Sequence, residues 1–206
     1  MDFIKKIVLV GMMLTMYIMV QAQDTKTIIR AFENSYIHEA DTNYIQAIQE
    51  LKNIYDPASY HINARLGYLS YLSGMLTESV AYYQKAIELK PYAIEARFGL
   101  TYPASAMGNW AQVKDQYIKI LEVDPQNTKA NYYLGLMEYN AASYELAAKH
   151  FEKVVNFYPF DLESILMYAW TNYQMGKTRE AKVLFNEALI VQPGNESALE
   201  GLELIK

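Results

Sequence analysis

Proline recurs in this chain at a fixed interval of 34 residues. Pro57, Pro91, Pro125, Pro159 and Pro193 keep this spacing, and only Pro103 falls outside it. A fixed period of about 20–50 residues is typical of a repeat array, in which each supersecondary unit stacks on its neighbours. Because the residue before a proline is disfavoured in the α conformation, each periodic proline is expected to end a helix.

Other positions agree at the same period when repeats are counted from Tyr60, Ile94, Thr128 and Leu162. Position 24 is always aromatic, and small residues recur at positions 8, 15 and 20. The aromatic residues are Tyr83, Tyr117, Phe151 and Phe185, and the small ones include Gly67, Gly74, Ser79, Gly108, Gly135, Ala142, Ala147, Ala169, Gly176 and Ala181. Small residues predict close helix contacts, the aromatics would fill the space between hairpins, and glycine at position 15 suits a turn.

This pattern resembles the tetratricopeptide repeat family, whose 34-residue unit is a helix, a turn and a second helix. The resemblance covers four units, residues 60–195, or about two thirds of the chain. It implies an all-α, right-handed solenoid of antiparallel helical hairpins. Position 4 departs from the tryptophan of the family, because it carries Asn63, Arg97, Asn131 and Ile165.

We expect one solenoid domain over residues 23–206, with about five hairpins and a capping helix. Its predicted parts are a degenerate repeat at 26–59, repeats at 60–93, 94–127, 128–161 and 162–195, and a cap at 196–206 with Asn195 as its N-cap. In the degenerate repeat Ile48 and Leu51 sit one place early, which predicts a shorter turn between its helices.

The first helices of the four clear repeats are predicted over 60–73, 95–107, 128–141 and 162–175, and the second helices over 77–90, 111–123, 144–157 and 178–191. Pro103 lies inside one of these first helices, where it predicts a kink. Two interpretations stay open: a tolerated bend, or a widening of the groove at that repeat.

The N-terminus has the pattern of a secretory signal peptide over residues 1–22. Lys5 and Lys6 precede an apolar run of 14 residues, Ile7 to Val20, and Val20-Gln21-Ala22 offers a cleavage site. The run is shorter than the roughly 20 residues of a bilayer-spanning helix. We therefore predict an exported chain, periplasmic or secreted, with no stable membrane insertion after cleavage; the alternative is an uncleaved anchor. Cysteine is absent, which excludes disulfides and a lipidated N-terminal cysteine.

The sequence shows no catalytic constellation. The three histidines, His38, His61 and His150, fall in three different hairpins, and no metal-ligand spacing or phosphate-binding loop is present. The net charge of −5 and the lack of a basic block give no support for nucleic-acid binding. We expect no enzyme activity, no cofactor and no metal site.

The family resemblance implies that the first helix of each hairpin lines a concave groove, through positions 2, 5, 9 and 12. Eight aromatic residues at positions 5, 9 and 12 are candidates for binding a partner: Tyr68, Tyr71, Phe98, Tyr102, Tyr132, Tyr139, Trp170 and Tyr173. Exposed aromatic residues concentrate at interaction hot spots. Packing is the alternative, and it is favoured for the position-12 residues Tyr71, Tyr139 and Tyr173.

These features predict a non-enzymatic exported scaffold or adaptor that binds a protein or peptide segment in its aromatic groove. Arg65 and Arg97 would set the direction of that segment through their charge. The alternative is a ligand-binding module that stacks a glycan or another small molecule on the same aromatics. The sequence specifies neither the partner nor the oligomeric state.

Overall fold

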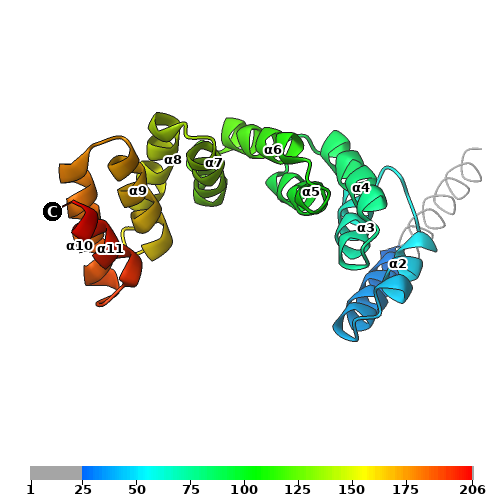
Figure 1. The fold of residues 1–206 in the computed structure, drawn as a ribbon. Coiled ribbons are helices and arrows are strands. Elements are labelled where there is room, and N and C mark those ends of the chain that lie inside the picture. Colours follow the sequence, from blue (N-terminus) through cyan, green and yellow to red (C-terminus); the bar gives the residue numbers. More distant parts are fainter. Residues whose placement is uncertain (1–24, 206) are drawn as a thin grey trace, which may run out of the picture. The chain divides into compact units, whose positions relative to one another are not determined.

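A computed structural model describes residues 25–205, and the predicted signal peptide lies outside them. All regular elements in the described residues are helices, and they fall into two compact units, divided between Met107 and Gly108. The all-α array of helical hairpins predicted from the 34-residue period is confirmed (Figure 1).

The first unit contains two hairpins and a final single helix. A helix over residues 25–40 pairs with α2 (Tyr44–Lys52), and α3 (Tyr60–Leu72) pairs with α4 (Leu76–Leu89). The last helix is α5 (Ile94–Ala106), which packs on α4 and also contacts α3. The helix continues through Pro103 to Ala106, and the ring of Pro103 is buried.

The second unit begins with α6 (Trp110–Val123). It continues with the hairpin of α7 (Thr128–Asn140) and α8 (Tyr144–Phe157), and then with the hairpin of α9 (Leu162–Gln174) and α10 (Thr178–Val191). A short helix, α11 (Glu196–Leu204), packs on α10 and α9, as expected of a cap. Asn195 is its N-cap, since its side-chain oxygen accepts a hydrogen bond from the Ala198 amide at 3.0 Å.

The aromatic side chains at position 24 fill the space between hairpins because the helices beside them carry glycine. A Cβ atom on Gly67 would lie 2.9 Å from the ring of Tyr83, and one on Gly99 would overlap the same ring. In the second unit, a Cβ atom on Gly135 would lie 2.7 Å from the ring of Phe151. The predicted close approach at Gly67 and Gly135 is therefore confirmed, and Gly99 has a packing reason of its own.

The turn inside each hairpin needs a residue with positive φ, and not every repeat supplies glycine. Gly74 and Gly176 take φ values of 79° and 73°, whereas Ala142 takes 55° and Thr42 takes 58°. The expected shorter turn in the first hairpin is wrong. Residues 41–43 connect its helices, as residues 73–75 connect α3 and α4. The second helix of this hairpin is shorter, since α2 has 9 residues where α4 has 14.

Candidate partner-binding surfaces

Four of the predicted groove residues lie on α3 and α5 of the first unit, and we call them the α3–α5 aromatic surface: Tyr68, Tyr71, Phe98 and Tyr102. Tyr68 and Tyr102 are 36% and 42% exposed, whereas Tyr71 and Phe98 are half-buried. The rings of Tyr71 and Tyr102 stack with their centroids 5.6 Å apart and their planes at 30°. The structure therefore brings side chains from two repeats together on one surface, as the column pattern predicts.

Tyr83, on α4, packs against α3 and α5 at points where those helices carry glycine. Its ring is buried against Gly67 and Gly99, where any Cβ atom would collide with the ring. Burial raises the pKa of the Tyr83 hydroxyl, and the neighbouring Tyr102, Tyr68 and Tyr60 raise it further. The exposed rings of Tyr68 and Tyr102 thus belong to one cluster of tyrosines around a buried centre.

Arg65 and Arg97 do not offer the free positive charge that the sequence predicted. The Arg65 guanidinium is buried, forms an ion pair with Glu39 at 2.5 Å, and lies 3.9 Å from the ring centroid of Tyr36. Arg97 is 9% exposed and donates a hydrogen bond to the Pro91 carbonyl at 2.7 Å. Both side chains are held by contacts within the chain, so the prediction that they direct a bound segment is wrong.

In the second unit, Trp170 and Tyr173 pack against the interior of the unit. The Trp170 ring meets Phe185 edge to face, with centroids 4.9 Å apart, and also meets Tyr173 at 5.7 Å. Its indole N–H donates to the Ser197 hydroxyl in α11 at 2.8 Å. Trp170 therefore joins the capping helix to α9, which supports the packing alternative for this residue. Tyr139 is half-buried and meets Tyr144 edge to face at 5.5 Å.

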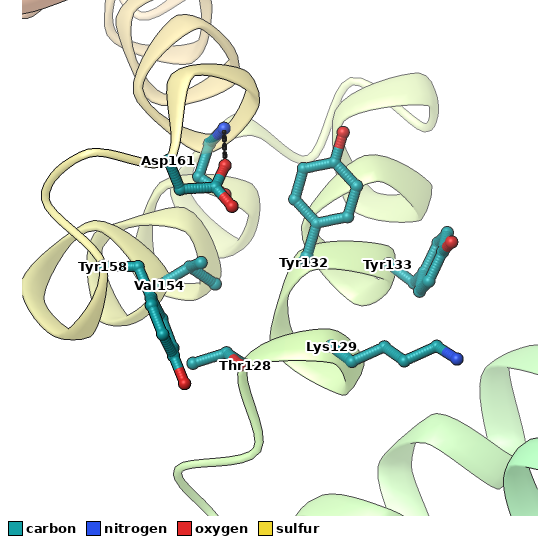
Figure 2. Close-up of a pocket in the computed structure, with 8 residues that line it drawn as sticks. Thr128, Lys129, Tyr132, Tyr133, Val154, Tyr158 and Asp161 are labelled. Atoms are coloured by element: carbon teal, nitrogen blue, oxygen red, sulfur yellow. Dashed lines mark hydrogen bonds between the residues drawn. The ribbon is translucent and has the colours of Figure 1, made fainter. Parts of the chain in front are cut away.

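Tyr132 differs from Tyr139, Trp170 and Tyr173 because it lines a cavity. The cavity has a volume of about 340 Å³ and lies between α7, the end of α8 and the start of α9 (Figure 2). We call it the Tyr132 pocket. Its lining residues are Thr128, Lys129, Tyr132, Tyr133, Val154, Tyr158, Asp161 and Ser164.

Sequence reasoning found Tyr132 but missed the other groups around the pocket. Tyr158 follows α8, and Asp161 is the N-cap of α9, where its carboxylate accepts a hydrogen bond from the Ser164 amide at 2.9 Å. An aspartate after the periodic Pro159 signals a helix start but gives no sign of a cavity. The pocket depends on the packing of the α8–α9 turn against α7.

Within residues 25–205, no group of three or more acidic or histidine side chains is placed to hold a metal ion. In the same part of the chain, no helix combines the length and apolar character that a membrane crossing requires.

Paired antiparallel helices, repeated at a constant interval and closed by a capping helix, define a helical repeat protein of the solenoid class. Comparison with known proteins agrees. Family models described as tetratricopeptide repeat match residues 60–92 and residues 104–161. These residues of the chain are tetratricopeptide repeats.

One curated relative is the TPR repeat-containing protein YpiA of Bacillus subtilis (strain 168), which is 26% identical over 170 residues. The match covers 81% of this chain, but the chain spans only 40% of the length of that relative.

Solved structures share the fold. A tetratricopeptide repeat protein from Parabacteroides merdae ATCC 43184 has a TM-score of 0.73 at 20% identity, with 87% of this chain and 72% of that chain covered. The MamA protein has a TM-score of 0.71 at 18% identity, with 82% and 93% covered. Repeat arrays of this family are generally non-catalytic and act as protein-interaction scaffolds.

Proposed function

We propose that this chain is an exported, non-enzymatic scaffold that binds a segment of a partner protein on the α3–α5 aromatic surface. The observation that carries the proposal is the exposure of Tyr68 and Tyr102, at 36% and 42%, on two helices, α3 and α5, that contact each other. Tyrosine gives a large contact area with few rotatable bonds, so little entropy is lost when a partner covers it.

Packing alone explains the buried tyrosine but not the exposed ones. Tyr83 fills the space between α3 and α5, whereas Tyr68 and Tyr102 leave more than a third of their surface to solvent. An apolar partner side chain lying across the stacked Tyr71 and Tyr102 rings would bury that surface.

Export is part of the same proposal. The charged start, the 14-residue apolar run and the Val20-Gln21-Ala22 site support cleavage after Ala22. The mature chain would then begin at Gln23 and meet its partner in the periplasm or outside the cell.

Capture experiments on an envelope extract test the binding proposal. Tagged wild-type protein is compared with the double variant Tyr68→Ala/Tyr102→Ala and with Tyr92→Ala, which removes an aromatic ring that is 81% exposed on a turn. We expect a partner that is retained by the wild type and by Tyr92→Ala but lost by the double variant. Equal retention by all three proteins would contradict the proposal, and retention of purified glycans in place of a protein would favour the small-molecule alternative.

A further inference from the structure

The Tyr132 pocket combines aromatic walls with a carboxylate. Tyr133 and Tyr158 are 39% and 56% exposed beside it, and the half-buried Tyr132 ring is held edge to face against Phe151 with centroids 6.1 Å apart. Asp161 stands at the rim, where one of its two carboxylate oxygens caps α9. Figure 2 shows Asp161, Tyr132 and Tyr158 around the same space.

Two carboxylates act on the Tyr132 hydroxyl at the pocket. Burial raises the pKa of the Tyr132 hydroxyl, and the carboxylates of Glu163 and Asp161 raise it further. Lys129 also borders the pocket, but its side chain extends away from Asp161 (Figure 2). The net charge of the whole chain is −5, which also favours a positively charged ligand.

The wall of the pocket also contains an unpaired polar group. The Ser164 side chain is fully buried, and its hydroxyl oxygen has no hydrogen-bond partner. A buried hydroxyl without a partner is unfavourable, so such groups in a folded protein call for an explanation. A donor group that enters the pocket, with a small shift of the serine rotamer, would supply the partner.

We propose that the Tyr132 pocket binds a basic side chain of a partner segment, with arginine preferred to lysine. A guanidinium group can lie against a tyrosine ring and at the same time direct N–H groups to the free oxygen of Asp161. A carboxylate-bearing ligand is disfavoured by Asp161 and Glu163, and an apolar one would leave the Ser164 hydroxyl without a partner. The inference rests on the proposed function, since it names the chemistry of a partner segment.

Titration with a small probe tests this pocket directly. Amide and side-chain NMR spectra of the full chain are recorded with increasing N-acetyl-arginine amide, and in parallel with N-acetyl-citrulline amide, which has the same shape without the charge. We expect saturable shifts around Tyr132, Tyr158 and Ser164 with the arginine probe only, and weaker binding at higher salt. Equal binding of the citrulline probe, or no saturable shift at these residues, would overturn the proposal.

Asp161→Asn separates charge from folding, because asparagine caps a helix about as well as aspartate. This variant should bind the arginine probe about fivefold more weakly or worse, a difference expected for one partly exposed charge. Glu187→Gln, which removes the same charge from an exposed position on α10, is the matched control and should bind as the wild type does. Equal affinities of Asp161→Asn and wild type would contradict the assignment.

The two proposals fail in different ways. If the arginine probe saturates the pocket but no protein partner depends on Tyr68 and Tyr102, the pocket stands and the proposed binding surface does not. The opposite outcome is a partner that depends on those tyrosines while Asp161→Asn binds both that partner and the arginine probe as tightly as the wild type does. In that case the proposed function stands, and the proposal that the pocket binds a basic side chain is wrong.

Discussion

The side-chain amide of Asn131 donates a hydrogen bond to the carbonyl oxygen of Pro125 at 3.2 Å. The same relationship recurs one and two repeats earlier, where Arg97 donates to the Pro91 carbonyl at 2.7 Å and Asn63 to the Pro57 carbonyl at 3.3 Å. Position 4, at which the sequence departs from the tryptophan of the family, thus ties a first helix to the proline that ends the preceding helix. Ile165 has no donor, so the fourth repeat lacks this link.

Asn131 should be important for stability because it is fully buried and satisfies several groups. Besides the Pro125 carbonyl, it donates to the Asn127 carbonyl at 2.9 Å, and its oxygen lies 2.9 Å from Nδ1 of His150. Asn131→Leu keeps the volume but leaves these partners unpaired, and we expect a loss of about 1–3 kcal/mol in the free energy of unfolding. Urea denaturation measures this loss in the free energy of unfolding. Asn186→Leu, at an exposed asparagine on α10, is the control, and equal stabilities of the two variants would contradict the role of Asn131.

The stability of the chain should fall as the solution becomes acidic, through His150. Burial lowers the pKa of this histidine, and Lys153 and Lys114 lower it further, while Glu138 acts in the opposite direction. The unfolded chain therefore takes up the proton more readily than the folded chain. The contribution of neutral His150 to the free energy of unfolding is lost as pH falls below the ordinary histidine pKa of about 6.5. Between about pH 7 and pH 5, the free energy of unfolding should decline less for His150→Gln than for the wild type, as measured by denaturation. His61→Gln, at an exposed histidine, is the control. A decline in His150→Gln as large as that of the wild type would refute the assignment.

Gly135 should not tolerate a larger side chain. A Cβ atom there would already lie 2.7 Å from the fully buried ring of Phe151, which has no solvent to move into. We expect Gly135→Leu to lose about 1–3 kcal/mol of stability by overpacking. Ala111→Leu, at an exposed position of α6, should have little effect in the same thermal unfolding experiment. Gly135→Leu combined with Phe151→Leu should lose less than the sum of the single changes, because the smaller residue makes room.

Export can be checked by the mature N-terminus. If residues 1–22 form a cleaved signal peptide, the protein recovered from the periplasm or medium begins at Gln23, and N-terminal sequencing shows this directly. An intact Met1 on membrane-associated protein would favour the uncleaved anchor instead.

The sequence predicted those parts of the fold that repeat. The helices of the four clear repeats begin and end within one residue of their predicted bounds, because proline, glycine and the small residues mark the same local structure in each unit. Gly135 and Asn195 were found for the same reason, since a close helix contact and an N-cap depend on nearby residues.

The contacts that the sequence did not reveal join residues outside the repeating columns. The environment of Arg65 depends on Glu39 and Ser35, in a hairpin whose columns are shifted, and Trp170 depends on Ser197 in the capping helix. The Tyr132 pocket is lined by residues of α7 and of the α8–α9 turn, which lie in different columns of the repeat. Periodicity indicates which residues face a common side, but not which of them already have a partner within the chain.

The affinity for the captured partner tests the central claim most directly. Calorimetric titration of that partner into the wild type, Tyr68→Ala/Tyr102→Ala and Tyr92→Ala, with matching helicity confirmed by circular dichroism, compares the α3–α5 aromatic surface with a more exposed ring elsewhere. We predict that the double variant binds at least about tenfold more weakly, as expected for hot-spot aromatics, and that Tyr92→Ala binds as the wild type does. An unchanged dissociation constant for a correctly folded double variant would contradict the account.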